Sequence, residues 1–230
     1  TTSPTWRAPA PRFSCAQLSD ATTKPFQARR DLSGDRQPTG TAMSNAIIAK
    51  IKSGKFSRLE MLQMRLNAEP KAKNGDPAAR AIIEAIDTTA VPKLEAEYVF
   101  MGFCPGADFE NRRDLDWMEN GICTFDYVQS KSQMQRFSKI MTGDTIILKK
   151  REGFGKTMRL FGHGVVTERR DRKTDGLRYL MVDWSQQREI LEVPLMGCNS
   201  TVDVRPLGVV EAKLPSDFWK WLGSEKPTRE

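Results

Sequence analysis

Seven short segments with the pattern of β-strands lie within residues 94–222, and they constrain the fold more than any other feature of the chain. Most are rich in β-branched or aromatic residues, and turn-forming Gly and Asp residues separate several of them. The segments are 98–104, 122–127, 145–150, 159–167, 179–184, 190–194 and 202–211. Many short strands with few helices are typical of a small closed or nearly closed β-barrel, which we expect here.

Three helical segments accompany the predicted strands. Two are expected at 113–119 and 132–141, and a third begins at a Ser216 cap and packs apolar side chains such as Trp219. We therefore predict an α+β domain over residues 93–223, a small β-barrel with flanking helices, and a tail over 224–230.

Residues 43–92 have the pattern of three short helices that form a separate module. The first stops at Gly54, and the second begins at Ser57 with a capping box that Glu60 completes. The third begins at Asp76-Pro77, an N-cap followed by proline at the first helical position. We expect this module to precede the β domain and to end near the proline at position 92.

The spacing of apolar residues predicts which side chains of the module point inward. They are Leu59, Leu62 and Leu66 in the second helix, and Ile82, Ile83 and Ile86 in the third. Basic residues would form another face, made of Lys50, Lys52, Lys55, Arg58 and Arg65. This basic face is either a solvated surface or a DNA-contacting one, and the sequence leaves both interpretations open.

Residues 1–42 are rich in Pro, Thr, Ser and Arg without apolar periodicity, which predicts a disordered extension. Met43 follows directly, and we expect the native chain to begin there. A targeting peptide and a basic tail are the alternatives, and Asp20, Asp31 and Asp35 count against a targeting peptide.

The chain has 36 Lys and Arg against 29 Asp and Glu, and its formal net charge of +7 favours a polyanionic partner. No apolar run approaches the roughly 18 residues of a membrane-spanning helix, so no membrane partner is expected.

The four cysteines form no C-x-x-C pair, which argues against a zinc ribbon. No secretory signal is visible, and we interpret the cysteines as reduced thiols of a cytoplasmic protein.

Few residues suit a catalytic role. His163 is the only histidine, so most acid–base, triad and metal-ligand schemes lack their usual partner. The Gly-Phe-Gly-Lys loop at 153–156 has neither the spacing nor the following helix of a Walker phosphate loop. We therefore expect no catalytic residue, no metal and no cofactor.

One enzymatic alternative remains. A predicted strand that ends in Glu211-Ala212-Lys213 resembles the motif of PD-(D/E)xK nucleases, in which carboxylates hold a metal and the lysine polarises water. Asp203 or Asp183 would have to supply the other carboxylate.

Aromatic and basic residues favour a binding role instead. Trp117 lies in a polar segment where periodicity does not dictate burial, and Asn120 follows it closely. A flipped base requires a ring for stacking and an amide that reads its Watson–Crick edge, although Trp117 could equally close one end of the barrel. Two basic runs on either side of His163 could contact phosphates or be solvated loops. The candidate phosphate-binding residues are Lys149, Lys150, Arg151, Lys156, Arg159, Arg169 and Arg170.

Over roughly residues 96–211 the chain resembles the PUA-like superfamily, and within it the EVE-type domains that read modified bases, often in restriction or RNA-modification contexts. The resemblance rests on the strand at 97–102, the segment at 117–121, the Met-x-x-Gly-Asp-x-Ile segment at 141–147 and the Gly-x-Gly-Val strand at 162–165. It implies a structural tight turn at Gly143-Asp144 and a base pocket beside the first strands. The pocket residues that it implies are Phe103, Trp117, Asn120 and Phe125.

These observations predict a non-catalytic nucleic-acid-binding protein that recognises a modified or flipped base in an aromatic pocket. DNA is favoured over RNA, and an effector protein is a further candidate partner. A metal-dependent nuclease and a protein-interaction or regulatory domain are the alternative functions.

Overall fold

The computed structural model describes residues 40–104, 109, 111–125, 130–151, 155–171 and 178–224, and the side chains at 40, 41, 171 and 178 are not described. Almost all of the predicted extension at 1–42 and of the tail at 224–230 therefore lies outside the described residues. So do the end of the predicted strand at 122–127 and most of the loop at 153–156. Residues 38–230, which include both the helical module and the β domain, belong to one structural unit.

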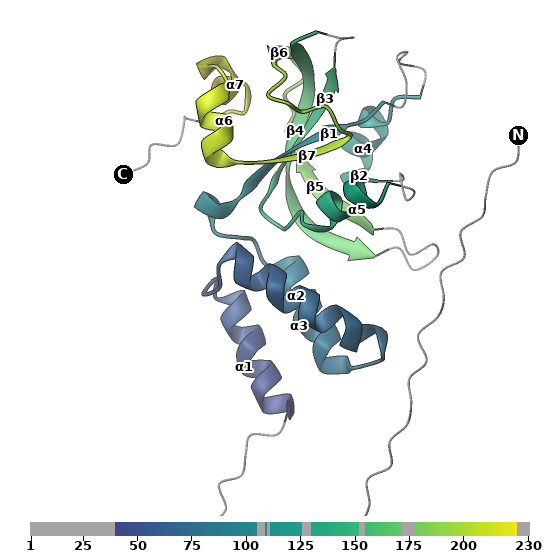
Figure 1. Ribbon diagram of the computed structural model, residues 1–230, viewed down its shortest axis with the longest axis vertical. Helices are drawn as coiled ribbons and strands as arrows, with labels where there is room; N and C mark the ends of the chain where they lie inside the picture. The colour runs from purple at the N-terminus through teal and green to yellow at the C-terminus, as the bar shows by residue number, and fades with distance from the viewer. Residues whose placement is uncertain are drawn as a thin grey trace, which may run out of the picture. The chain divides into compact units, whose positions relative to one another are not determined.

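A seven-stranded sheet forms the centre of the β domain (Figure 1). The strands are β1 Glu97–Gly102, β2 Ile122–Thr124, β3 Thr145–Arg151, β4 Thr157–Asp171, β5 Arg178–Trp184, β6 Leu191–Pro194 and β7 Val202–Pro206. Their order is β2-β5-β4-β3-β1-β7, with β6 paired to the start of β4. Only β1 and β3 are parallel among these described pairings. All seven predicted segments contain a strand, and the sheet they form is mixed and not closed.

The last predicted strand is wrong in its second half. The strand β7 ends at Pro206, and α6 follows over Leu207–Lys213. Leu207 and Val210 are buried on one side of this helix, so the apolar run there has helical spacing rather than strand alternation.

Three further helices flank the sheet, as predicted. They are α4 Asp114–Asn120, α5 Lys131–Ser138 and α7 Ser216–Trp221. The Ser216 cap is wrong, because Pro215 occupies the N-cap of α7 and no side chain caps the helix. Gly121 ends α4 in the left-handed conformation with φ of 64°, which only glycine adopts without strain.

Side chains of the central strands alternate between two apolar clusters, one on each face of the sheet. Ile146 and Leu148 of β3 join one cluster, to which α4 and α5 contribute Trp117 and Phe137. Ile147 joins the other, which consists largely of side chains from α6, α7 and the neighbouring strands. Figure 1 shows α6 and α7 together on one side of the sheet and α4 and α5 on the other. Burial on both faces explains why these strands are apolar almost throughout.

The three helices of the N-terminal module are also confirmed, as α1 Gly40–Lys52, α2 Arg58–Lys73 and α3 Pro77–Thr88. Ser57 and Glu60 form the predicted capping box of α2. Asp76 caps α3 by accepting from the backbone N–H groups of Ala78 and Ala79.

The predicted inward face of α2 is wrong at two of its three leucines, whereas Leu62 is half-buried against the core of the helical module. Leu59 and Leu66 are 76% and 61% exposed, whereas Arg58 and Arg65 are buried. The buried side of α2 faces carboxylates, and Arg58 and Arg65 pair with Asp144 and Asp87 there. Arg58 and Arg65 therefore do not belong to an exposed basic face.

Asp144 connects the helical module to the sheet. Its carboxylate is fully buried and accepts hydrogen bonds from both terminal nitrogens of Arg58, at 2.5 and 2.9 Å. It also accepts from the backbone N–H groups of Glu97 and Met141, at 2.9 and 2.8 Å. Gly143 precedes it with φ of 96°, and an added Cβ would lie 3.2 Å from the backbone nitrogen of Val91. The Gly143-Asp144 turn thus has a structural role.

Candidate nucleic-acid interface

Three phenylalanine rings form a cluster to which Phe103, just after β1, and Phe161, in the early part of β4, both contribute. Phe103 and Phe161 pack edge to face, with ring centroids 4.9 Å apart. Phe109 lies 5.7 Å from Phe161 and 6.5 Å from Phe103. Phe103 and Phe161 are buried, and Phe109 is half-buried, so Phe109 is the ring of this cluster that reaches the surface.

Three cationic side chains cover these rings, and we refer to the six residues together as the aromatic–cation cluster. The Lys150 ammonium nitrogen lies 3.4 Å from the centroid of the Phe109 ring. The Arg112 guanidinium carbon is 5.4–5.9 Å from all three centroids. The Arg159 guanidinium carbon is 5.9 Å from the Phe161 centroid. These distances are those of cation–π contacts, which hold the charges in place over the rings.

Strand register explains how part of this cluster is built. Lys150 of β3 lies opposite Arg159 of β4 in the antiparallel pair. Because side chains alternate along β3, Lys150 points to the Phe109 side while Lys149 points to the opposite face. Sequence reasoning named both lysines but could not say which one faces the rings.

Arg112 was not among the predicted site residues. Its Nε and Nη2 atoms donate to the two carboxylate oxygens of Asp114, at 2.8 and 2.5 Å, and Asp114 is fully buried. The hydrogen bond with Asp114 raises the pKa of the Arg112 guanidinium above its ordinary value. A bidentate pair of this kind fixes the plane of the guanidinium. The Arg-x-Asp spacing is the only sequence signal that could have indicated it.

The four predicted pocket residues do not come together as one open pocket in the described part of the chain. Phe103, Trp117 and Phe125 are 1%, 3% and 2% exposed and belong to one apolar cluster. Phe125 stacks on Phe137, with centroids 5.4 Å apart. Asn120 is exposed, and its amide donates to the backbone oxygen and the carboxylate of Asp116, both at 2.9 Å.

Two of the seven predicted phosphate-binding residues are buried. Lys149 contacts Asp203 at 2.9 Å and donates to the backbone oxygens of Cys198 and Ser200 at 2.6 Å. Burial lowers the pKa of the Lys149 ammonium, and Asp203 opposes this shift. Arg169 donates to the backbone oxygens of residues 138 and 140. Both side chains therefore hold the interior together and are too buried to contact phosphates.

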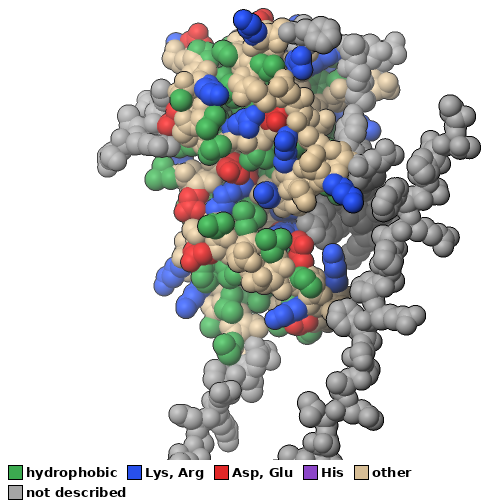
Figure 2. Space-filling model, in the orientation of Figure 1, with side chains coloured by type: hydrophobic (Ala, Val, Ile, Leu, Met, Phe, Trp, Pro, Cys, Tyr) green, Lys and Arg blue, Asp and Glu red, His purple; other side chains and the backbone are tan. Residues whose placement is uncertain are grey.

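The other five predicted residues reach the surface. Arg151, Lys156 and Arg170 are exposed, while Lys150 and Arg159 are half-buried at the aromatic–cation cluster. Arg170 pairs with Glu168 at 2.6 Å. On the face shown in Figure 2, Lys and Arg side chains are interspersed with acidic and uncharged ones rather than gathered in one continuous patch.

His163 lies in the interior beside Trp221, with ring centroids 4.7 Å apart. Burial lowers the pKa of its imidazole, a hydrogen bond with the Trp221 backbone opposes this shift, and the charge of Arg188 adds to it. The neighbouring Gly164 has no room for a side chain, since an added Cβ would lie 2.6 Å from the Asp183 backbone oxygen. The Gly-His-Gly motif is thus explained by packing.

The strand on which the nuclease alternative depended is absent at that position. Glu211 and Lys213 lie on α6, and Asp203 is buried against Lys149. Within the described ranges, no group of three or more His, Cys, Asp or Glu side chains could hold a metal ion.

Comparisons of the chain with protein-family models, curated proteins and solved structures gave no match. Among the helices that the structure describes, none is long and apolar enough to cross a membrane.

Proposed function

We propose that the protein binds nucleic acid without catalysing a reaction, and that the aromatic–cation cluster is its binding surface. The observation that carries this proposal is the placement of Arg112 and Lys150 over the surface-reaching Phe109 ring, with Arg159 over the adjoining Phe161 ring. Recognition of a single strand or of a flipped base has two components. Cations follow the phosphate backbone, and an aromatic ring beside them stacks on a base.

Phe109 is the proposed stacking ring, because Phe103 and Phe161 support it from the interior. The Lys150 ammonium lies over this ring at 3.4 Å and would move to a phosphate when a base takes its place. Exposed Arg151 and Lys156 extend the positive charge beyond the cluster. A base that is already unpaired, or extruded from a duplex, would be bound in this way.

A narrower version of the proposal rests on the sequence resemblance to PUA-like domains. The Gly143-Asp144 turn precedes β3 in the way that the resemblance to PUA-like domains implies. We therefore propose a PUA-like domain of the EVE type that reads an extruded, modified base, with DNA as the favoured partner. The base would stack on Phe109 instead of on Trp117, which is buried.

Binding of the full chain to fluorescent DNA and RNA, with and without modified bases, tests this proposal. Phe109→Ala should cost about 1–3 kcal/mol of binding free energy if one base stacks on the ring. Phe109→Tyr keeps the ring and should retain the affinity, which separates stacking from a general loss of structure. Unchanged affinity in Phe109→Ala would refute this stacking role.

A further inference from the structure

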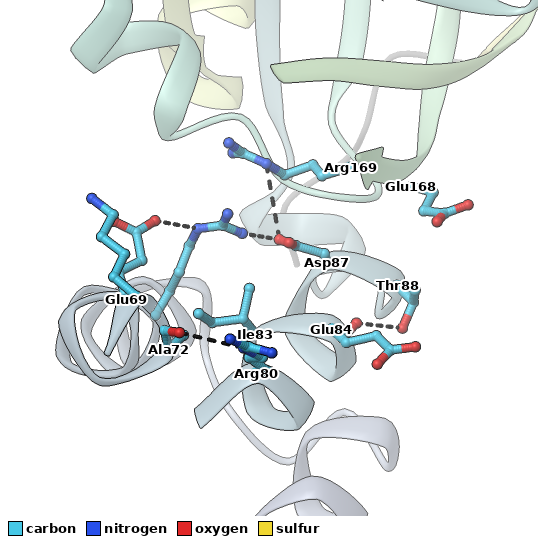
Figure 3. Close-up of a pocket in the computed structure, with 11 residues that line it drawn as sticks. Glu69, Ala72, Arg80, Ile83, Glu84, Asp87, Thr88, Glu168 and Arg169 are labelled. Atoms are coloured by element: carbon cyan, nitrogen blue, oxygen red, sulfur yellow. Dashed lines mark hydrogen bonds and ion pairs between the residues drawn. The ribbon is translucent and has the colours of Figure 1, made fainter. Parts of the chain in front are cut away.

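A pocket of about 380 Å³ lies between α2, α3 and the end of β4 that is remote from the aromatic–cation cluster (Figure 3). Arg169 of β4 lines it, eight positions along the strand from Phe161, so the pocket is a separate feature. Arg65 and Arg169 are the two residues of its wall that the sequence suggests for nucleic-acid binding, and both are buried.

Buried charges form the inner wall of the pocket. Asp87 of α3 pairs with Arg65, and the Nε atom of Arg169 lies 3.9 Å from the same carboxylate. The Nε atom of Arg65 contacts Glu69 at 3.1 Å. The side chains of Arg65 and Arg169 are each 4% exposed, so this inner wall is held in place by packing as well as by charge.

The outer wall carries charges of both signs at the surface. Lys73 and Arg80 are exposed where α2 ends and α3 begins, and the Nε atom of Arg80 donates to the Ala72 backbone oxygen at 3.3 Å. Glu84 is exposed further along α3, where its backbone oxygen accepts from Thr88 at 2.8 Å. Figure 3 shows Glu84, Thr88 and Glu168 on one side of the pocket and Ala72 and Glu69 on the other.

The balance of charge restricts the ligand. Four of the lining residues are Lys or Arg and four are Asp or Glu, so the pocket has no net charge. A ligand of one sign would meet like charges in such a site, whereas a dipolar ligand satisfies both signs. One water occupies about 30 Å³ in the liquid, so the volume suits a ligand of about a dozen non-hydrogen atoms.

We propose that this pocket binds a small zwitterion of about dipeptide size. The anionic end lies at Lys73 and Arg80, and the cationic end lies at Glu84. Because its walls come from the helical module and from β4, bound ligand raises the stability of the junction between them.

Calorimetric titration of the full chain with L-alanyl-L-alanine tests the proposal. The N-acetylated dipeptide carries only the negative charge at neutral pH, and the dipeptide amide carries only the positive charge. The zwitterion should bind saturably, raise the thermal midpoint as its concentration rises, and bind more tightly than either blocked form. No saturable binding, or equal binding of a blocked form, would overturn the proposal.

A pair of double variants identifies the site. Arg80→Gln/Glu84→Gln removes one exposed charge of each sign from the pocket and should weaken zwitterion binding about tenfold or more. Lys220→Gln/Asp217→Asn is the matched control. It also removes one charge of each sign, from an exposed ion pair on α7, and should leave binding unchanged. Equal affinity in both double variants would place the zwitterion elsewhere and overturn the assignment.

Discussion

Arg58 donates hydrogen bonds to both carboxylate oxygens of Asp144, at 2.5 and 2.9 Å, although 86 residues separate the two in sequence. The same guanidinium contacts Glu97 at 2.7 Å and the Lys139 backbone oxygen at 2.8 Å. Arg58 belongs to the helical module, and the other residues belong to the β domain. The ion pair therefore joins two parts that the sequence suggests are separate.

Arg58→Met should destabilise the protein by about 3–5 kcal/mol, because it leaves the buried Asp144 carboxylate without its cation. Urea unfolding measures this change. Lys220→Met removes one partner of an exposed pair and should have little or no effect. Equal stability of the two variants would contradict the role given to the buried pair.

Lys149→Met should lower stability, since it removes a cation from the buried Asp203 carboxylate, to which Arg136 and Arg205 are the other charged neighbours. Adding Asp203→Asn should recover part of the loss, and a double-mutant cycle measures that coupling. Salt dependence of nucleic-acid binding should stay the same in Lys149→Met. A changed salt dependence would indicate that Lys149 contacts phosphate, and it would contradict the structural role given to this residue.

Gly164→Ala should cost about 1–3 kcal/mol or more, because the new Cβ would lie 2.6 Å from the Asp183 backbone oxygen and 2.6 Å from a Val182 methyl carbon. Gly102→Ala is the matched control within the same sheet, since its Cβ would meet Thr201 at an ordinary 3.5 Å. Thermal unfolding compares the two variants. Similar thermal midpoints in the two variants would mean that β5 moves aside at little cost, which would contradict the prediction.

His163 should make the protein sensitive to mild acid. Burial lowers the pKa of His163 in the folded protein. As the pH falls below 6.5, the unfolded chain therefore takes up a proton at this histidine before the folded chain does. This contribution is complete above pH 6.5 and is lost as pH falls toward the folded pKa. The stability difference between the wild type and His163→Gln should therefore shrink between neutral pH and the folded pKa. A constant difference over that range would contradict the lowered pKa.

Local patterns predicted most of the fold because strands and helix caps are encoded by near neighbours. The β-branched, apolar run in 145–150 and the Ser57–Glu60 capping box depend only on residues close in sequence, and both elements are present in the structure. The α6 helix was missed because Val209 and Val210 suit a strand equally well, and only burial against the sheet decides between the two structures.

The site was harder to predict because it depends on which charged side chain faces which partner. Lys149 and Lys150 are neighbours with the same chemistry, yet one is buried against Asp203 and the other covers Phe109. Arg58 fills an inward position because Asp144, far away in sequence, offers a carboxylate there. No single-sequence pattern carries that information.

Binding of the full chain to a fluorescent duplex and to its single strands, measured from about 50 to 200 mM salt, tests the nucleic-acid interface most directly. Arg151→Gln/Lys156→Gln should reduce the slope of log affinity against log salt by about 0.9 for each duplex phosphate that the variant no longer neutralises. Lys50→Gln/Lys52→Gln removes two exposed lysines from α1 and should leave the slope unchanged. No binding to DNA or RNA, or an equal reduction in both double variants, would contradict the proposed interface.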